Sequence, residues 1–136
     1  MLSARLKAIV EALPLKPGLR VLEIGCGPGT AAREVAARIG SGYVLGIDRS
    51  PRAIAQATTL CAGAPNLSFR VAAVEEFELS EGEELFDLAF AVRVGALDGR
   101  HPDLERRARQ RIRDAMTPDG RLYIDGGDPL REMPLR

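Results

Sequence analysis

The chain alternates short apolar runs with amphipathic stretches as far as residue 125. Ser3 can cap a first helix whose apolar positions recur at helical spacing, and Pro14 ends that helix. Five β-prone runs follow, at residues 21–24, 43–48, 67–71, 86–92 and 121–125. Helical patterns stand between them, at residues 30–39, 51–61 and 103–116, and the acidic stretch 75–84 fits only a short helix or a loop. Apolar strands that alternate with helices predict an α/β fold whose parallel sheet is covered on both faces.

The carboxyl ends of the predicted strands bring together residues from distant parts of the chain. Right-handed crossovers place all of these ends at one edge of a parallel sheet, where ligands bind in such folds. The residues expected to meet there are Gly25, Asp48, Ala72, Ala73, Ala91, Val92, Arg93 and Asp125.

Chain length and charge narrow the classes of protein to consider. The 136 residues fit a single domain over residues 1–136, with an N-terminal helix within residues 1–17 and a C-terminal tail at residues 126–136. The 19 basic residues balance the 19 acidic residues, so no overall field draws the chain to nucleic acid or to an anionic membrane.

The sequence also lacks membrane and metal-binding patterns. No apolar run approaches the ~20 residues that span a bilayer. Arg5, Lys7 and Glu11 interrupt the N-terminus where a signal peptide needs an apolar stretch, so we expect a cytoplasmic protein. Cys26 and Cys61 do not have the spacing of metal ligands, and we expect no metal site.

The run VLEIGCGPG, residues 21–29, is the most informative stretch. Glycines have no Cβ, so the backbone can adopt positive φ and approach a ligand, and the following helix presents free N–H groups. A dinucleotide fingerprint would need glycine at Thr30, and a P-loop would need a G-K-[ST] ending that is absent. Asp48 follows the turn by about 20 residues, where a carboxylate can accept both ribose hydroxyls of an adenosine ligand.

This run resembles the first motif of class I S-adenosylmethionine-dependent methyltransferases, an acidic residue two places before G-x-G-x-G at a strand end. The resemblance implies a Rossmann-like three-layer αβα sandwich, with a mainly parallel sheet of about five strands in the order 3-2-1-4-5. It also implies S-adenosylmethionine as cofactor and S-adenosylhomocysteine as product. Glu23 and Gly25 would then face the methionine end of the cofactor, within a turn completed by Cys26, Gly27 and Gly29. A solvated or capping carboxylate is the alternative role for Glu23.

The resemblance is weaker around the expected adenine site. Family members carry a Gly-Asp-Ala step after strand three, and this chain has Ala72, Ala73 and Val74 instead. The Val74 N–H could still serve adenine, with Glu75 or Glu76 as a substitute acceptor. Arg49 follows the ribose-binding acid and would either stack on adenine or lie exposed. Ala91, at the end of strand four, completes the predicted cofactor contacts.

Candidate catalytic residues follow strand four. If the methyl acceptor must lose a proton, Asp98 and His101 are the available bases. The alternatives are a turn at Asp98 and a surface histidine at the start of a helix. The sequence lacks the [DN]-P-P-[FY] tetrapeptide of base-amine and glutamine-amide methylation. Small molecules, other protein sites and other RNA positions stay open as acceptors, and of these we expect a small molecule. Arginines along residues 103–116 could meet an acidic partner or form a solvated helix face.

The C-terminal tail departs from the family pattern. Complete members of the family it resembles add a final helix and two more strands, one of which pairs with strand five, whereas the tail here is short and holds Pro129 and Pro134. We therefore expect no antiparallel hairpin, and an unpaired edge on strand five that the tail or a second copy of the chain covers.

Three functional hypotheses remain from the sequence. The first is a methyltransferase that acts on an unidentified acceptor. The second is a non-catalytic S-adenosylmethionine-binding subunit or a regulatory subunit that depends on a partner. The third is another nucleoside-binding Rossmann-like protein, such as an NAD-binding module.

Overall fold

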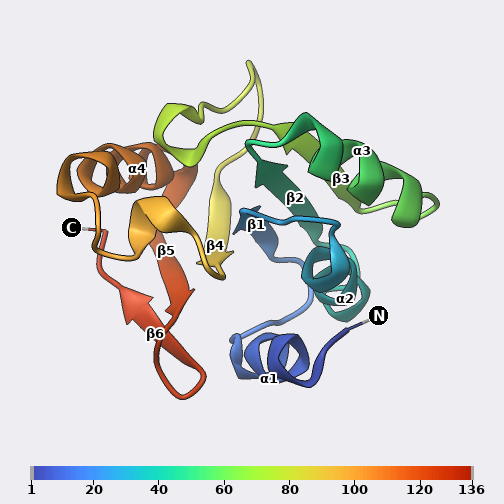
Figure 1. Cartoon of the computed structure of the whole chain (residues 1–136). Helices are drawn as coiled ribbons and strands as arrows, with labels where there is room; N and C mark the ends of the chain where they lie inside the picture. Colours follow the sequence, from blue (N-terminus) through green and yellow to red (C-terminus); the bar gives the residue numbers. More distant parts are fainter. Residues whose placement is uncertain (1, 136) are drawn as a thin grey trace.

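A computed structural model describes residues 2–135 and shows a six-stranded sheet with helices on both faces (Figure 1). The strands are β1 (Arg20–Ile24), β2 (Tyr43–Asp48), β3 (Leu67–Val71), β4 (Phe86–Ala91), β5 (Met116–Asp125) and β6 (Leu130–Met133). Their order in the sheet is β3-β2-β1-β4-β5-β6. The first five strands pair in parallel, and β6 pairs antiparallel with β5. The predicted order of the five parallel strands is therefore confirmed.

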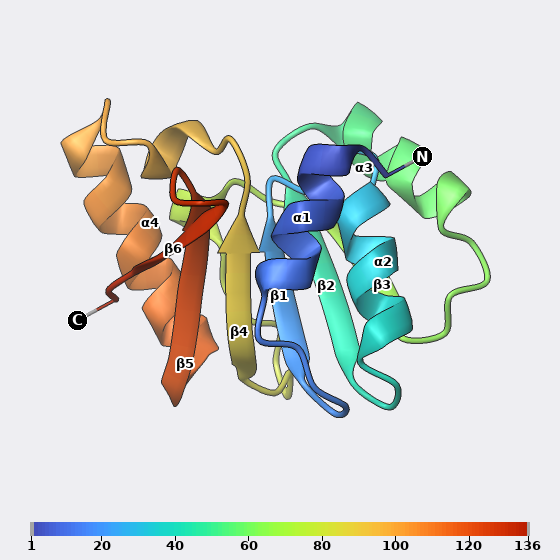
Figure 2. The ribbon, with the colours of Figure 1, turned by 90° about the horizontal axis from the view of Figure 1, so that it is seen from below.

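The helices form the two outer layers. They are α1 (Ala4–Ala12), α2 (Thr30–Arg38), α3 (Pro51–Leu60) and α4 (Pro102–Ala115), with short 3₁₀ turns η1 (Val74–Glu76) and η2 (Gly95–Leu97). Helices α1 and α2 cover one face of the sheet and α4 covers the other (Figure 2). Helix α3 packs against β2 and β3. No helix of residues 2–135 is long and apolar enough to cross a membrane.

Alternation along the buried strands gives each face its own core. On β1, Val21 packs with α1 and α2, and its neighbour Leu22 packs with α4 on the opposite face. On β4, Phe90 and Ala89 divide between the two cores in the same way. Successive residues of a strand point to opposite faces, so a central strand must be apolar at nearly every position to be covered on both sides.

The tail contradicts two predictions from the sequence, that the sheet has five strands and that the C-terminal hairpin is absent. Leu130–Met133 forms β6 and occupies the edge of β5 that we expected to be unpaired. Pro129 and Pro134 lie just outside this strand, so neither removes a hydrogen bond from within it. Met133 is buried in the core with α4, which anchors the strand. The tail itself thus takes the place proposed for a second copy of the chain.

Strand β5 is also longer than its apolar pattern predicted. It begins at Met116, which pairs with Phe86 ahead of an irregularity in the register between Phe86 and Leu88. The predicted helix 103–116 accordingly ends one residue earlier, at Ala115. Residues 117–120 lie within the bounds of β5, between the paired residues Met116 and Arg121.

Candidate functional site

Glycines in the turn between β1 and α2 leave part of its backbone without side chains. Gly25 and Gly29 both have positive φ, at 67° and 86°. A Cβ on Gly25 would lie 2.8 Å from Val94 Cγ2, and one on Gly29 would lie 2.7 Å from Phe69 Cζ. Both positions therefore require glycine for backbone conformation and for space.

Asp48, the last residue of β2, is hydrogen-bonded to two neighbouring loops. Its Oδ2 accepts from the backbone N–H of Gly27 over 2.9 Å, and its Oδ1 accepts from the backbone N–H of Ser50 over 2.9 Å. Each carboxylate oxygen has two acceptor sites, so both oxygens retain capacity for a further donor. Asp48 thus fixes the glycine turn and still faces a cavity as an acceptor.

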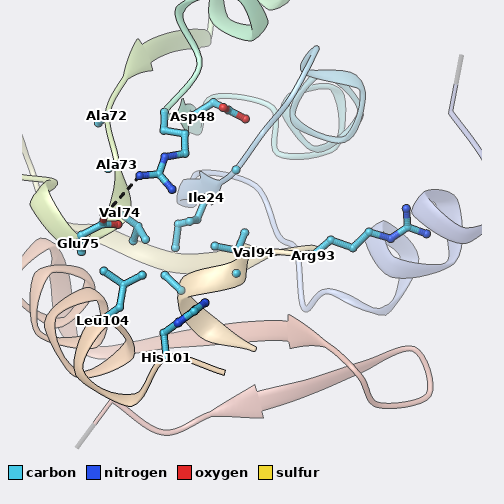
Figure 3. Close-up of a pocket in the computed structure, with 14 residues that line it drawn as sticks. Ile24, Asp48, Ala72, Ala73, Val74, Glu75, Arg93, Val94, His101 and Leu104 are labelled. Carbon is cyan, nitrogen blue, oxygen red and sulfur yellow. Dashed lines mark ion pairs between the residues drawn. The ribbon is translucent and has the colours of Figure 1, made fainter. Parts of the chain in front are cut away.

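A first cavity of about 330 Å³ opens at the carboxyl edge of the sheet, between Asp48 and the start of α4 (Figure 3). Ile24, Val94 and Leu104 supply apolar walls. Ala73 and Val74, the residues predicted to contact adenine, line the side of this cavity that follows β3. Arg49 lies exposed at the rim, with a side chain that is 75% accessible, and forms an ion pair there with Glu75 over 3.8 Å.

A second cavity of about 700 Å³ lies on the other side of Gly25, beneath α1. Its lining residues are Ser3, Arg5, Leu6, Glu23, Gly25, Cys26, Gly27, Pro28, Thr30, Ala31, Val92 and Arg93. Burial raises the pKa of the Cys26 thiol, which makes Cys26 part of the wall and not a reactive group. Gly29 lines neither cavity, because it is the N-cap of α2 and packs on Phe69.

Glu23 is the buried acid of the second cavity. Its exposed fraction is 3%, and its Oε1 has no hydrogen-bond partner among residues 2–135. Burial raises the pKa of Glu23 to about 8; a backbone hydrogen bond from Ala32 opposes this shift, and the Asp48 carboxylate adds to it. A buried carboxylate with an unsatisfied oxygen beside a cavity is suited to bind a cationic or hydrogen-donating ligand group.

The two candidate bases lie in different places. His101 lines the first cavity together with Asp48 and Val74 (Figure 3). Asp98 lies in a third cavity and accepts from the backbone N–H and Nε of Arg100, over 3.0 and 2.7 Å. The backbone hydrogen bond from Arg100 is the main reason that the pKa of Asp98 lies below its usual value. Ala91, predicted as a cofactor contact, also lines this third cavity and not the first two.

Comparison with known proteins identifies the family. A family model described as a methyltransferase domain matches residues 21–120, from β1 into β5. The chain belongs to the methyltransferase domain family. The match confirms the resemblance to class I S-adenosylmethionine-dependent methyltransferases that begins at the glycine turn.

Characterised relatives share this methyltransferase domain. The chain is 30% identical over 124 residues to a trans-aconitate 2-methyltransferase of Methylobacterium nodulans, covering 91% of this chain and 44% of that protein. It is 43% identical over 84 residues to a ubiquinone biosynthesis O-methyltransferase of Rhizobium etli, covering 62% of this chain and 32% of that protein. The chain thus spans less than half the length of either relative.

A solved structure shows the same fold around a bound product. The N-methyltransferase NodS of Bradyrhizobium japonicum, in complex with S-adenosylhomocysteine, superimposes on the methyltransferase domain with a TM-score of 0.67 and 25% identity. The superposition covers 79% of this chain and 52% of NodS.

The structure adds residues to the site that the sequence reasoning did not assign. Arg93 was expected at the carboxyl edge without a role, yet it lines all three cavities. Arg5 and Leu6 of α1, together with its N-cap residue Ser3, form a wall of the second cavity. No local signal reveals these placements, because the ion pair that joins α1 to β5, Arg5 to Asp125 over 2.8 Å, connects residues 120 positions apart.

Proposed function

We propose that this methyltransferase domain binds S-adenosylmethionine across the first and second cavities and transfers its methyl group to a small-molecule acceptor. The observation that carries the proposal is the glycine floor at Gly25, which separates a cavity containing Asp48 from a cavity containing Glu23. S-adenosylmethionine consists of an adenosine group and an amino-acid group joined by one sulfur atom. Two cavities, one on each side of the Gly25 backbone, can therefore hold its two ends.

The residues of both compartments fit the two ends of this cofactor. The remaining acceptor sites of Asp48 suit ribose hydroxyls, and Ala73 and Val74 offer an apolar seat for adenine. The unsatisfied Oε1 of Glu23 suits the ammonium group of the methionine end. Because the pKa of Glu23 is about 8, binding an ammonium there would favour loss of the carboxyl proton at neutral pH.

When bound, the cofactor supplies an electrophilic methyl group, so the protein needs no covalent nucleophile. The main task of the chain is to orient an acceptor, which accounts for roughly 7 to 11 kcal/mol of barrier lowering in favourable systems. We assign proton removal to His101, because its side chain lines the first cavity, whereas Asp98 is held by Arg100 in another cavity.

A small-molecule acceptor agrees with the names of two relatives, which act on trans-aconitate and in ubiquinone biosynthesis. The chain also lacks the [DN]-P-P-[FY] tetrapeptide after β4, which argues against base-amine and glutamine-amide methylation.

Calorimetric titration with S-adenosylmethionine, S-adenosylhomocysteine and NAD tests cofactor choice. We expect both adenosyl ligands to bind and NAD not to bind. A labelled methyl donor, incubated with the chain and a panel of small acids, phenols and amines, then tests transfer. Binding without transfer to any acceptor would favour the non-catalytic or partner-dependent subunit, and NAD binding alone would favour the third hypothesis.

A further inference from the structure

Arg93 has an unusual backbone conformation. Its φ of 57° is the only positive value at a non-glycine residue in the described chain, residues 2–135. The Arg93 N–H donates to Asp125 Oδ1 over 3.0 Å, and Asp125 Oδ2 in turn accepts from Arg5 over 2.8 Å. Left-handed backbone is unfavourable for a long side chain, and such outliers cluster at functional sites. The contacts of Asp125 hold Arg93 in this conformation.

The position of Arg93 is also distinctive. It lines the first and second cavities, assigned above to the cofactor, and a third cavity of about 310 Å³ beside them. Its side chain extends away from the labelled residues of the first cavity (Figure 3). Among residues 2–135, no hydrogen bond or ion pair engages its guanidinium group. One exposed cation therefore stands where the three cavities meet.

The third cavity is lined by two arginines, Arg93 and Arg131, and by two acids, and the two kinds of residue differ in whether they are paired. Two acids line it, and each already has an arginine partner: Asp98 pairs with Arg100 over 2.7 Å, and Asp125 pairs with Arg5 over 2.8 Å. Arg131 of β6 lines the same cavity and has no ion-pair partner in the described part of the chain. Its Nε lies 3.8 Å from the Cβ position of Gly126, which places it over the β5–β6 turn.

We propose that Arg93 and Arg131 bind a carboxylate of the methyl acceptor in the third cavity. The proposal rests on the proposed function and names the substrate class that the site selects. A guanidinium group presents a planar fork of donors that matches a carboxylate. The carboxylates of Asp98 and Asp125 in the same wall disfavour a phosphate group, which carries up to two charges, more than a carboxylate group, which carries one. Since Arg93 also borders both cofactor cavities, an acceptor held by its carboxylate lies next to the methyl donor.

Calorimetry on the chain saturated with S-adenosylhomocysteine tests this proposal. The ligands are succinate and tricarballylate, with succinamide and glycerol phosphate as comparisons. We expect the acids to bind and the amide and phosphate to bind weakly or not at all. Arg93→Gln and Arg131→Gln should each weaken acid binding by about tenfold, and Arg107→Gln, a change of an exposed arginine on α4, should have no effect.

The remaining outcomes separate this proposal from the proposed function. If S-adenosylhomocysteine binds but the acids do not bind at millimolar concentration, the carboxylate site is wrong and the function stands. If Arg93→Gln weakens S-adenosylhomocysteine binding but not acid binding, Arg93 serves the methionine carboxylate and the acceptor site is wrong. If S-adenosylhomocysteine does not bind, the proposed function fails. Titration of the chain alone with succinate and tricarballylate then still tests whether Arg93 and Arg131 bind a carboxylate.

A second variant separates recognition from folding. Arg93→Gly relieves the left-handed strain, so its thermal midpoint should equal or exceed that of the native chain while acid binding falls. A variant that loses acid binding only together with its folded structure would show a purely structural role for Arg93 and overturn the proposal.

Discussion

The Oδ2 atom of Asp48 accepts the backbone N–H of Gly27 over 2.9 Å, which ties the end of β2 to the turn after β1. The acid proposed to bind the ribose therefore also holds the glycine turn that forms the cofactor floor. Because this hydrogen bond joins Asp48 to the glycine turn, the two parts of the site that would contact the cofactor are positioned together.

Asp48→Asn tests this double role. The amide loses the charge and one acceptor, so S-adenosylhomocysteine affinity should fall by at least about tenfold, since hydrogen bonds to charged groups contribute about 1.5 to 3 kcal/mol each. Asp87→Asn is the matched control, because Asp87 accepts from the Arg20 N–H over 2.9 Å outside the three cavities. Equal loss of affinity in both variants would remove Asp48 from the binding site.

Glu23 predicts a specific dependence of stability on pH. Its folded pKa of about 8 lies above the ordinary value of 4.5, so its stabilising contribution is complete below pH 4.5 and is lost as the pH rises to about 8. Glu23→Gln removes this titration. The unfolding free energy of the variant, relative to the native chain, should rise across this window by up to about 1.4 kcal/mol per pH unit.

Chemical denaturation at several pH values measures the effect of Glu23. Glu81→Gln, on an exposed loop, should show no such trend relative to the native chain. A parallel pH profile for Glu23→Gln and the native chain would show that Glu23 ionises normally.

Substitutions of His101 and Asp98 should have different effects on kcat. If His101 removes the proton from the acceptor, His101→Asn should lower kcat by roughly a hundredfold or more, a larger loss than any that it causes in S-adenosylhomocysteine affinity. Asp98→Asn should lower kcat much less, because Asp98 lines the proposed acceptor cavity but its carboxylate is already paired with Arg100. Steady-state kinetics with the acceptor found in the panel measures both. The reverse ranking would move the base to Asp98.

The tail strand predicts a stability effect distant from the site. Met133 of β6 is buried with α4, and Met133→Ala should destabilise the chain by about 2 to 5 kcal/mol through the cavity that it leaves. Glu132→Ala removes an exposed ion pair with Arg121 and should cost no more than about 1 kcal/mol. Urea denaturation distinguishes the two variants. Equal costs would mean that β6 does not pack as described.

Local signals explain what the sequence predicted well. Ser3 caps α1 as expected and accepts from the N–H of Leu6 over 3.1 Å, and Ser50 caps α3 in the same way by accepting from the N–H of Ala53 over 3.1 Å. The glycine turn and Asp48 also follow from short-range patterns, because strand ends in a parallel sheet converge whatever lies between them.

Non-local contacts explain what the sequence did not predict. Strand β6 exists because the tail pairs with β5 and buries Met133, whereas two nearby prolines suggested that no strand could form. The conformation of Arg93 depends on a hydrogen bond to Asp125, 32 residues further along the chain. Local side-chain patterns do not identify partners so far apart in the sequence. Both features could therefore be recognised only in the three-dimensional structure.

Titration of the native chain with S-adenosylhomocysteine, in the absence of any acceptor, tests the central claim most directly. The account predicts saturable binding at one site and a higher thermal midpoint, with about 2.7 kcal/mol of added stability when the ligand is at ~100 times its dissociation constant. No heat of binding and no change of midpoint at millimolar ligand would contradict it.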